Sequence, residues 1–351
     1  MNSKERVMAV FNHQIPDRVP MWCGASPEFM EKARVELGLG SIEDVYVRFH
    51  DDFRRVYARY AGPEIYHPEY TTPEGKNISV FGIERHGIGY GQAIYNPLAE
   101  ATLEEVNNYN WPDPEWYDVS HIREDALAWD GEYAVLGGEW CPFFHDAVDL
   151  LGMENMMILM YEEPEIVHAV MEHIVDYYYA ISKRIFEAAK GSIDIFFIGN
   201  DLGSQKGPLL GENLFREFLY PHLKRLTDLG KEYGIPTMMH CCGNFAKLIP
   251  SVIDCGIAAV QSLQPVAECM RAPYLKEHFG GKIILNGGID SVNLLINGTA
   301  EQTKKAVCET LRVMKPGGGY ILSPSHDYLL PETKVENVIA MYDTALEYGQ
   351  Y

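Results

Sequence analysis

The sequence has little positive charge for its size. Its 351 residues include 29 lysines and arginines against 50 aspartates and glutamates, and the formal net charge is −21 at pH 7. No dense run of Lys or Arg is present. Because surfaces that follow a phosphate backbone need such clusters, we expect no nucleic-acid partner. The acidity is interpreted as a well-solvated surface.

Long hydrophobic runs are also missing. No stretch of about 18 apolar residues appears, so we expect no segment that spans a membrane. Residues 1–11 form an amphipathic stretch interrupted by polar residues, unlike the continuous apolar segment of a secretory signal. The seven cysteines are an odd number scattered through a large chain, a pattern that suits a reducing compartment. These features predict a soluble cytoplasmic protein.

The chain contains no internal repeat, linker or low-complexity tract, and neither a Walker A motif nor a dinucleotide fingerprint. Gly287-Gly288 and Gly317-Gly318-Gly319 are therefore interpreted as tight turns and not as phosphate cradles. The hydrophobic fraction of 47% is enough for a large core. We predict a single domain over residues 1–351.

What the second half does contain is a regular alternation of two patterns. Short β-branched or aromatic runs end in Gly or a polar residue; they cover residues 133–138, 193–199, 235–240, 257–263, 282–288 and 319–323. Stretches with helical periodicity lie between and after them, at residues 164–190, 213–233, 245–255, 270–279, 299–315 and 334–348. Strands that are apolar throughout, without alternation, are typical of a parallel sheet covered on both faces.

Six strand–helix units in a row predict an α/β fold with a parallel sheet. A closed barrel needs eight, so two more strands must come from the first 130 residues. Arg18–Trp22 is one candidate, whereas residues 77–94, rich in Gly and Tyr, resemble an antiparallel excursion. We predict a single (β/α)8 TIM-type barrel with an elaborated N-terminal part. A doubly wound open sheet is the alternative.

Polar side chains follow each predicted strand where it ends. They are Glu139 and His145; Asn200, Asp201 and Gln205; His240 and Cys242; Gln264; Asp290; and His326 and Asp327. In parallel α/β sheets and barrels this edge is where ligands bind. The coincidence of all these residues at one edge predicts a binding or catalytic site there.

The sharpest local feature is His240-Cys241-Cys242. Alternate residues of an extended strand point the same way, so His240 and Cys242 would share a face. An imidazole and a thiolate are suitable ligands for Zn²⁺, and a catalytic zinc usually has three protein ligands. His326 is the best third ligand, with Asp327, Asp290 and Asp201 as alternatives. A buried histidine beside two small hydrophobic cysteines is the competing interpretation.

Several motifs together resemble the uroporphyrinogen decarboxylase superfamily, in particular its branch of methylcobalamin:thiol methyltransferases and corrinoid-dependent demethylase components. The resemblance runs over nearly the whole chain. It is carried by Asp17-Arg18-Val19-Pro20, Asn110-Trp111-Pro112-Asp113-Pro114, residues 200–205, residues 240–244, Leu263-Gln264-Pro265, residues 287–290 and residues 318–327. The superfamily implies a distorted (β/α)8 barrel.

Two departures refine what the resemblance implies. True decarboxylases of this superfamily have an N-terminal Arg-Gln-Ala-Gly-Arg segment that grips the substrate carboxylates. After Arg18-Val19-Pro20 this chain continues Met21-Trp22-Cys23-Gly24 and has neither arginine, which disfavours porphyrinogen decarboxylation. The methyltransferase branch is similar to a zinc enzyme with His-x-Cys plus a distant Cys. His240 and Cys242 match the first two ligands, and His326 replaces the Cys.

The resemblance therefore implies a zinc-dependent methyltransferase that moves a methyl group between a corrinoid and a small thiol, ether or amine. Asp201, Glu139 and Asp290 would orient the substrate or exchange a proton. Gln205, Gln264, Asn200, His145 and Asp327 would bind it. The corrinoid would be a co-substrate on a separate protein or in solution, because the chain has no Asp-x-His-x-x-Gly segment of the kind that ligates cobalt.

Two alternatives to this function are open. One is a decarboxylase acting on a smaller substrate than a porphyrinogen. The other is a binding component of a corrinoid system without chemistry of its own.

Overall fold

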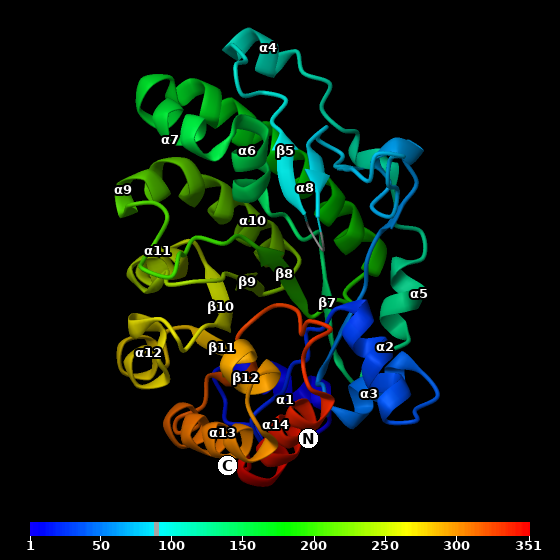
Figure 1. The fold of residues 1–351 in the computed structure, drawn as a ribbon, viewed down its shortest axis with the longest axis vertical. Helices are drawn as coiled ribbons and strands as arrows, with labels where there is room; N and C mark the ends of the chain where they lie inside the picture. The colour runs from blue at the N-terminus through cyan, green and yellow to red at the C-terminus, as the bar shows by residue number, and fades with distance from the viewer. Residues whose placement is uncertain (88–90) are drawn as a thin grey trace.

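The computed structural model describes residues 1–87 and 91–351, and its centre is a curled sheet of seven parallel strands (Figure 1). The strand order is β1-β7-β8-β9-β10-β11-β12. The strands are β1 (Phe53–Arg55), β7 (Ala134–Gly137), β8 (Ile195–Gly199), β9 (Thr237–His240), β10 (Ile257–Leu263), β11 (Ile284–Ile289) and β12 (Tyr320–Pro324). The last six confirm the six predicted runs and the parallel sheet. A curled sheet of this kind is consistent with a TIM-type barrel.

Helices follow these strands along the chain and cover the outside of the sheet (Figure 1). The helices that follow β7 to β12 are α6 (Phe143–Leu151), α7 (Met153–Glu162), α8 (Pro164–Ala189), α9 (Glu212–Leu214), α10 (Tyr220–Glu232), α11 (Ile249–Asp254), α12 (Ala272–Phe279), α13 (Ala300–Met314) and α14 (Val335–Tyr348). Local signals fix their ends: α8 begins with a proline at its first turn, and α13 has a capping box between Thr299 and Gln302. The predicted helical stretches are thereby confirmed.

The N-terminal part is elaborated, as predicted. It contains α1 (Ser3–Phe11), α2 (Pro27–Glu36), α3 (Ile42–Arg48), α4 (Leu103–Asn107) and α5 (Ile122–Leu127), with a short pair of strands, β2 (Arg59–Tyr60) and β6 (Tyr117–Asp118). The antiparallel excursion predicted at residues 77–94 is a three-stranded sheet of β3 (Asn77–Ile78), β4 (Glu84–His86) and β5 (Gln92–Tyr95). Residues 88–90 of that prediction lie outside the described residues.

The concave side of the sheet has its own small hydrophobic core. Each of the seven strands contributes to it, and the first helix closes it with Val7, Val10 and Phe11. The strand residues include Phe53, Leu136, Phe197, Met238, Ala259, Ile284 and Ile321. Because α1 packs against this inner core, the N-terminal end of the sheet is filled by apolar side chains.

The segment predicted as an eighth strand, Arg18–Trp22, lies between the two edges of the sheet without forming a strand. Leu322 of β12 donates its backbone N–H to Pro20 and accepts one from Trp22, at 2.9 and 3.0 Å. The N–H of Asp52, just before β1, donates to the carbonyl of Met21 at 2.9 Å. The segment thus bridges β12 through Met21 and Leu322 and contacts the β1 edge through the hydrogen bond from Asp52, and a complete eight-stranded barrel stays a prediction.

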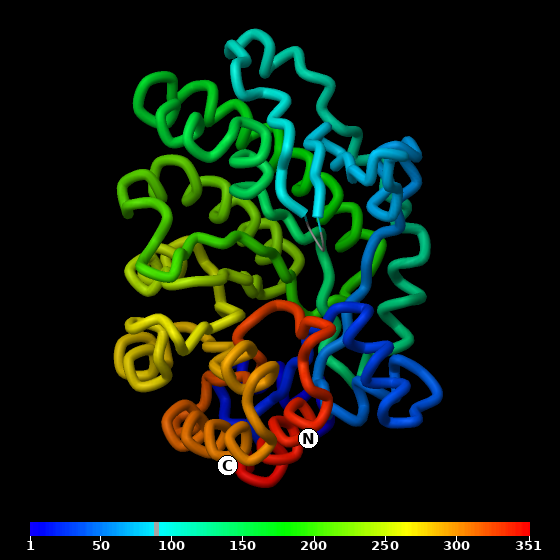
Figure 2. The backbone as a smooth tube through the Cα atoms, viewed as in Figure 1, coloured from blue at the N-terminus to red at the C-terminus, as the bar shows by residue number. Residues whose placement is uncertain are grey.

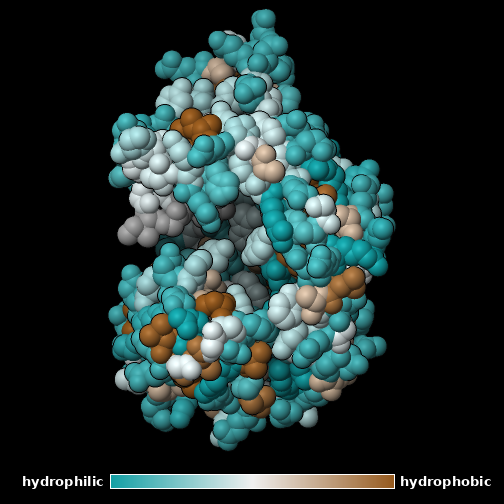
Figure 3. All heavy atoms as spheres, turned by 90° about the vertical axis from the view of Figure 1, so that its right-hand side faces the viewer, coloured by the Kyte–Doolittle hydropathy of each residue, from teal (hydrophilic) through white to brown (hydrophobic). Residues whose placement is uncertain are grey.

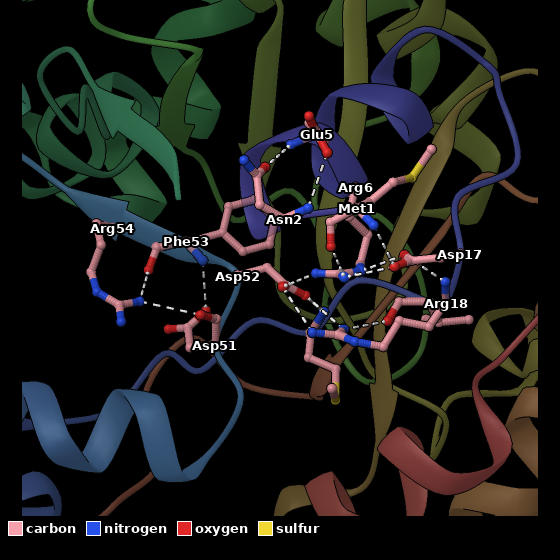
Figure 4. A network of polar contacts seen from close by, with 12 residues as sticks. Met1, Asn2, Glu5, Arg6, Asp17, Arg18, Asp51, Asp52, Phe53 and Arg54 are labelled. Atoms are coloured by element: carbon pink, nitrogen blue, oxygen red, sulfur yellow. Dashed lines mark hydrogen bonds and ion pairs between the residues drawn. The ribbon is translucent and has the colours of Figure 1, made fainter. Parts of the chain in front are cut away.

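A buried ion network holds this seam together (Figure 4). The Asp52 carboxylate is 0% exposed and accepts hydrogen bonds from the guanidinium of Arg6 at 2.9 Å and from that of Arg18 at 2.8 and 2.9 Å. It also accepts from the backbone N–H of Met21 at 2.8 Å. Arg6 in turn pairs with Asp17 at 2.7 Å. The network joins α1, the Pro20–Trp22 segment and β1 at the N-terminal end of the sheet.

The first and last segments of the chain meet at the same end (Figure 2). Arg18 forms an antiparallel bridge with Gln350, and the backbone N–H of Tyr351 donates to the carbonyl of Asp17 at 3.1 Å.

None of the helices in residues 1–87 and 91–351 is long and apolar enough to cross a membrane. The face in Figure 3 is mostly hydrophilic and is hollowed near its centre.

Candidate metal centre and its surroundings

The end of β9 places His240 and Cys242 on one side. The Sγ of Cys242 lies 3.3 Å from the Nε2 of His240, whereas the intervening Cys241 turns away and accepts a hydrogen bond from the N–H of Leu202 at 3.2 Å. His240 is 5% exposed, and Cys242 is half-buried. The alternation predicted for an extended segment therefore holds, and an imidazole and a thiol converge.

A third side chain reaches the same point from the neighbouring strand. Asp201 follows β8, and its Oδ1 lies 3.2 Å from His240 Nε2. The same oxygen accepts the backbone N–H of Cys242 at 2.6 Å. One ligand atom of each of Asp201, His240 and Cys242 lies within 4.8 Å of the others. Nitrogen, sulfur and carboxylate oxygen are the donors that zinc takes in proteins, so this group fits a zinc ion.

The imidazole and the carboxylate in this group shift each other's pKa toward the charged form. Burial disfavours the charged form of His240, but the sulfur of Cys242 and the carboxylates of Asp327 and Asp201 outweigh it and raise the pKa of the imidazole well above its ordinary value. Burial likewise works against ionised Asp201, but hydrogen bonding and charge from His240 and the nearby His145 hold the pKa of this carboxyl well below its usual range. A proton on His240 would compete with a metal ion for the same nitrogen.

Two glycines allow the loops after β8 and β9 to touch backbone to backbone. A Cβ on Gly203 would lie 2.6 Å from the carbonyl oxygen of Cys242, and one on Gly243 would lie 2.5 Å from the backbone of Gly203. Gly243 also has φ +77°, a conformation that side chains other than glycine rarely adopt. Ser204 and Asn244 bridge the two loops. This contact fixes the spacing between Asp201 and the residues that follow β9.

A cavity of about 630 Å³ opens beside the group. Its lining includes Asp201, His240, Cys242 and residues of the loop after β12, and it extends to α6 and β5. Arg85 of β4 forms an ion pair at 2.6 Å with Asp149 of α6. The antiparallel sheet β3–β4–β5 is thereby attached over the C-terminal end of the parallel strands, and the volume is that of a small-molecule site.

The structure places His326, the predicted third ligand, at the rim of the same cavity and outside the close group. It is exposed, and its Nδ1 accepts the backbone N–H of Tyr328 at 3.2 Å. Its neighbour Asp327 lies deeper, with Oδ1 3.9 Å from the Nδ1 of His240. Among the alternatives weighed from the sequence, Asp201 is the one whose ligand atom is close. A role for His326 as a ligand stays a prediction.

Two other predicted binding residues also line the main cavity. His145 of α6 has its Nε2 3.6 Å from Asp201 Oδ2, and burial lowers the pKa of this imidazole. Asn200 is fully buried: its amide accepts the N–H of Phe144 at 3.0 Å and donates to the carbonyl of Cys141 at 3.1 Å. Both ends of that amide are thus bound to the β7–α6 connection.

The remaining predicted residues are divided between two further cavities. Gln205, Gln264 and Asp290 line one of about 270 Å³, together with His326. The carboxylate of Asp290 caps the helical segment Ser291–Ile296 through the N–H groups of Val292 and Asn293, each at 2.9 Å.

Glu139 lines a different cavity of about 510 Å³. Burial raises the pKa of its carboxyl against the opposing charge of Arg55. The three predicted acid–base residues, Asp201, Glu139 and Asp290, are therefore not brought together.

Sequence reasoning missed three residues near the group. The Nδ1 of His240 contacts Oε1 of Gln261 in β10 at 2.5 Å, and the ring of Trp140 lies 5.5 Å from that of His240. The guanidinium of Arg55, at the end of β1, lies 5.5 Å from the Trp140 ring. Gln261 lies inside a predicted strand and not at its end, and Arg55 lies in a strand of only three residues, so the search for polar residues after each predicted strand finds neither.

Comparisons with known proteins match the sequence to a family and the structure to a known fold. The uroporphyrinogen decarboxylase (URO-D) family model matches residues 93–348. A methylated-thiol–coenzyme M methyltransferase of Methanosarcina mazei is 30% identical over 52% of this chain and 46% of its own length. A methylcobamide:CoM methyltransferase MtbA of Methanosarcina acetivorans is 26% identical over 46% of each chain.

A uroporphyrinogen decarboxylase of Anaeromyxobacter sp. is 26% identical over 72% of this chain and 70% of its own. Among solved structures, a methyltransferase from Methanosarcina mazei superimposes with a TM-score of 0.68 over 99% of both chains at 18% identity, which shows the shared fold. The alignments to the two methyltransferases above span about half of their lengths. The chain belongs to the uroporphyrinogen decarboxylase family, and the resemblance to its methyltransferase branch is confirmed.

Proposed function

We propose that this protein is a zinc-dependent methyltransferase that moves a methyl group between a corrinoid and a small thiol, ether or amine. One observation carries the proposal: the imidazole, thiol and carboxylate of His240, Cys242 and Asp201 converge within 4.8 Å beside a cavity of about 630 Å³. The relatives named as a methylated-thiol–coenzyme M methyltransferase and a methylcobamide:CoM methyltransferase support it.

His240 and Cys242 would hold the metal, with Asp201 favoured by distance as the third ligand and His326 as its alternative. A zinc ion in such a site lowers the pKa of a bound thiol, or polarises the heteroatom that carries the methyl group. The chain's own contribution is to orient the substrate. Nε2 of His145 lies 3.6 Å from Oδ2 of Asp201, and burial lowers the pKa of this imidazole, which favours the neutral ring that can accept a proton from an entering thiol.

The corrinoid would come from a separate protein or from solution. The cavity extends to the β3–β4–β5 sheet, where Ala93 and Gln92 of β5 and Met153 of α7 form part of the lining. An incoming corrinoid would have to approach from this side, because α1 fills the opposite end of the sheet. Glu139 and Asp290, in separate cavities, would act on substrate parts that extend away from the metal.

The test is to measure zinc by elemental analysis in the wild-type protein and in Cys242→Ala, together with methyl transfer from free methylcobalamin to a small thiol. We expect stoichiometric zinc and methyl transfer in the wild type, and loss of both in the variant. Cys241→Ala is the matched control, because this neighbouring sulfur points away from His240 and should leave zinc in place. A wild-type protein that transfers methyl groups without bound metal would refute the zinc mechanism.

The second candidate is a decarboxylase on a small substrate, favoured by the longer alignment to a uroporphyrinogen decarboxylase. Release of carbon dioxide from a carboxylated substrate, with no methyl transfer, would establish it. A protein that binds zinc and a corrinoid partner but catalyses neither reaction would be a binding component.

A further inference from the structure

A row of polar side chains crosses the interior of the sheet directly below the metal group. His240, Gln261 and Asn286 occupy paired positions on β9, β10 and β11. Gln261 and Asn286 are 0% exposed. The residues two positions earlier on the same strands, which point to the same side, are apolar members of the inner core: Met238, Ala259 and Ile284. Burying an amide costs about 1–3 kcal/mol unless it is hydrogen-bonded, so polar residues here require a reason.

The contact between Gln261 and His240 is direct. Oε1 of Gln261 lies 2.5 Å from Nδ1 of His240. An amide oxygen can only accept a hydrogen bond, so Nδ1 must carry the proton. The lone pair of the neutral ring is then on Nε2, the nitrogen that faces Cys242 at 3.3 Å and Asp201 at 3.2 Å. The carboxylate of Asp327 also faces Nδ1, but at 3.9 Å it is beyond hydrogen-bond distance.

The far end of the row supports this orientation of the amide. Among the described residues, Nε2 of Gln261 and Oδ1 of Asn286 are buried atoms without a hydrogen-bond partner. One is a donor and the other an acceptor, and they belong to paired residues of neighbouring strands. This complementarity favours Gln261 with its nitrogen turned toward β11 and its oxygen toward His240.

We propose that Gln261 is a positioning residue that holds His240 in the tautomer with a free Nε2 and aims that nitrogen at the metal. The inference rests on the proposed function, because it requires the metal. The proposal also gives the buried amides a role. These amides lie inside the strands, so the search for polar residues at strand ends did not find them. The neutral side chain of Gln261 has one further effect. Cys242 and Asp201 would already supply two negative charges to a zinc dication, so Gln261 orients the imidazole ring without adding a third negative charge.

The test uses the full-length protein loaded with zinc and labelled with ¹⁵N-histidine. In the wild type we expect a slowly exchanging proton on Nδ1 of His240, identified by its absence in His240→Asn, and a metal-shifted Nε2. Gln261→Met keeps the length of the side chain and removes the acceptor. We expect about 10–100-fold weaker zinc binding in competition with a chelator, and loss of the protected Nδ1 proton.

Gln261→Glu keeps the acceptor and should restore both the protected proton and zinc affinity to at least the wild-type level. Thr237→Val is the matched control for removing a buried polar group from β9. Residue 237 lies three positions from His240 and therefore on the opposite face of the strand, so zinc affinity should not change.

Three results would overturn the proposal. The first is a proton on Nε2 of the wild-type ring with the metal on Nδ1, which is observable whether or not any variant folds. The second is unchanged zinc affinity in a folded Gln261→Met. The third is an Nδ1 proton that disappears in Asp327→Asn and not in Gln261→Met. Each leaves the zinc site itself standing, whereas a wild type that binds no zinc removes the proposed function along with it.

Discussion

The two ends of the parallel sheet use the same kinds of residue in opposite ways. At the N-terminal end, Asp52 is fully buried and each of its oxygens is bound by arginine side chains, so the charges form a closed network (Figure 4). At the C-terminal end, Asp201, His240 and Cys242 converge beside an open cavity. The first end joins the two edges of the sheet, and the second gathers donor atoms beside a cavity. In (β/α)8 barrels the C-terminal end carries the chemistry and the N-terminal end contributes stability.

If the N-terminal end serves stability, the largest loss of folding free energy is expected from Asp52→Asn. Removing one charge leaves Arg18 buried without its carboxylate, which should lower the free energy of unfolding by about 3–5 kcal/mol. Denaturant-induced unfolding measures it. Zinc content per folded molecule should stay the same, since the network is at the far end. Asp343→Asn, in an exposed ion pair with Arg48, is the control and should change stability by at most about 1 kcal/mol.

A paired substitution sharpens the description of the functional end. Loss of a residue that is hydrogen-bonded to a metal ligand weakens metal binding by about 10–100-fold. Asp201→Asn should weaken zinc binding by more than this, because it removes a ligand. His326→Asn, which alters a residue at the rim, should change it less. Chelator competition measures both affinities. The reverse order would restore His326 as the third ligand, as the sequence predicted.

Gly203→Ala tests whether the loop contact sets the spacing of the ligands. The new methyl group would lie 2.6 Å from backbone atoms of the loop after β9, so the loops must separate, at a cost of about 1–3 kcal/mol. Zinc affinity should fall together with thermal stability. In Gly211→Ala the Cβ meets no atom within 4 Å, and neither quantity should change. Normal zinc binding by Gly203→Ala would show that the ligands do not depend on this contact.

The smallest effect is expected from Asp17→Asn and depends on pH. Burial of Asp17 acts against its ionised form, but Arg6 and the N-terminal ammonium hold its pKa well below the usual value. Its contribution is therefore fully present above the unfolded pKa and is lost as the pH falls through the lower folded pKa. Because Asp17 is partly exposed, the variant should lose at most about 1 kcal/mol at pH 7. A difference that grew toward acid pH would contradict this sign.

Much of the fold was predictable because its signals are local. Apolar runs marked β7 to β12, and the helical periodicity between them matched the outer helices. The first strand was missed because it has three residues, two of them arginines, and its pairing partner β7 lies 81 positions later in the chain. Arg18–Trp22 was predicted as a strand, but it forms only two isolated bridges in the described residues, through Arg18 and Met21.

The candidate site was predicted in part for the same reason. Alternation along β9 was enough to place His240 and Cys242 together, and Asp201 appeared among the alternatives because it follows the adjacent strand. His326 was preferred to it as a histidine at the end of the last predicted strand, because the sequence does not reveal that His326 lies exposed at the rim of the cavity. Gln261 could not be found at all, because its role depends on the register between β9 and β10.

The backbone contact between Gly203 and Gly243 has a consequence for how this scaffold could diversify. Since main-chain atoms set the separation of the loops after β8 and β9, residues of the cavity lining that do not contact these loops can change while that separation is kept. Altering the preference for one substrate over another would then be a matter of exchanging residues on β5, α6 and α7. Libraries restricted to those elements should yield many variants that still load metal.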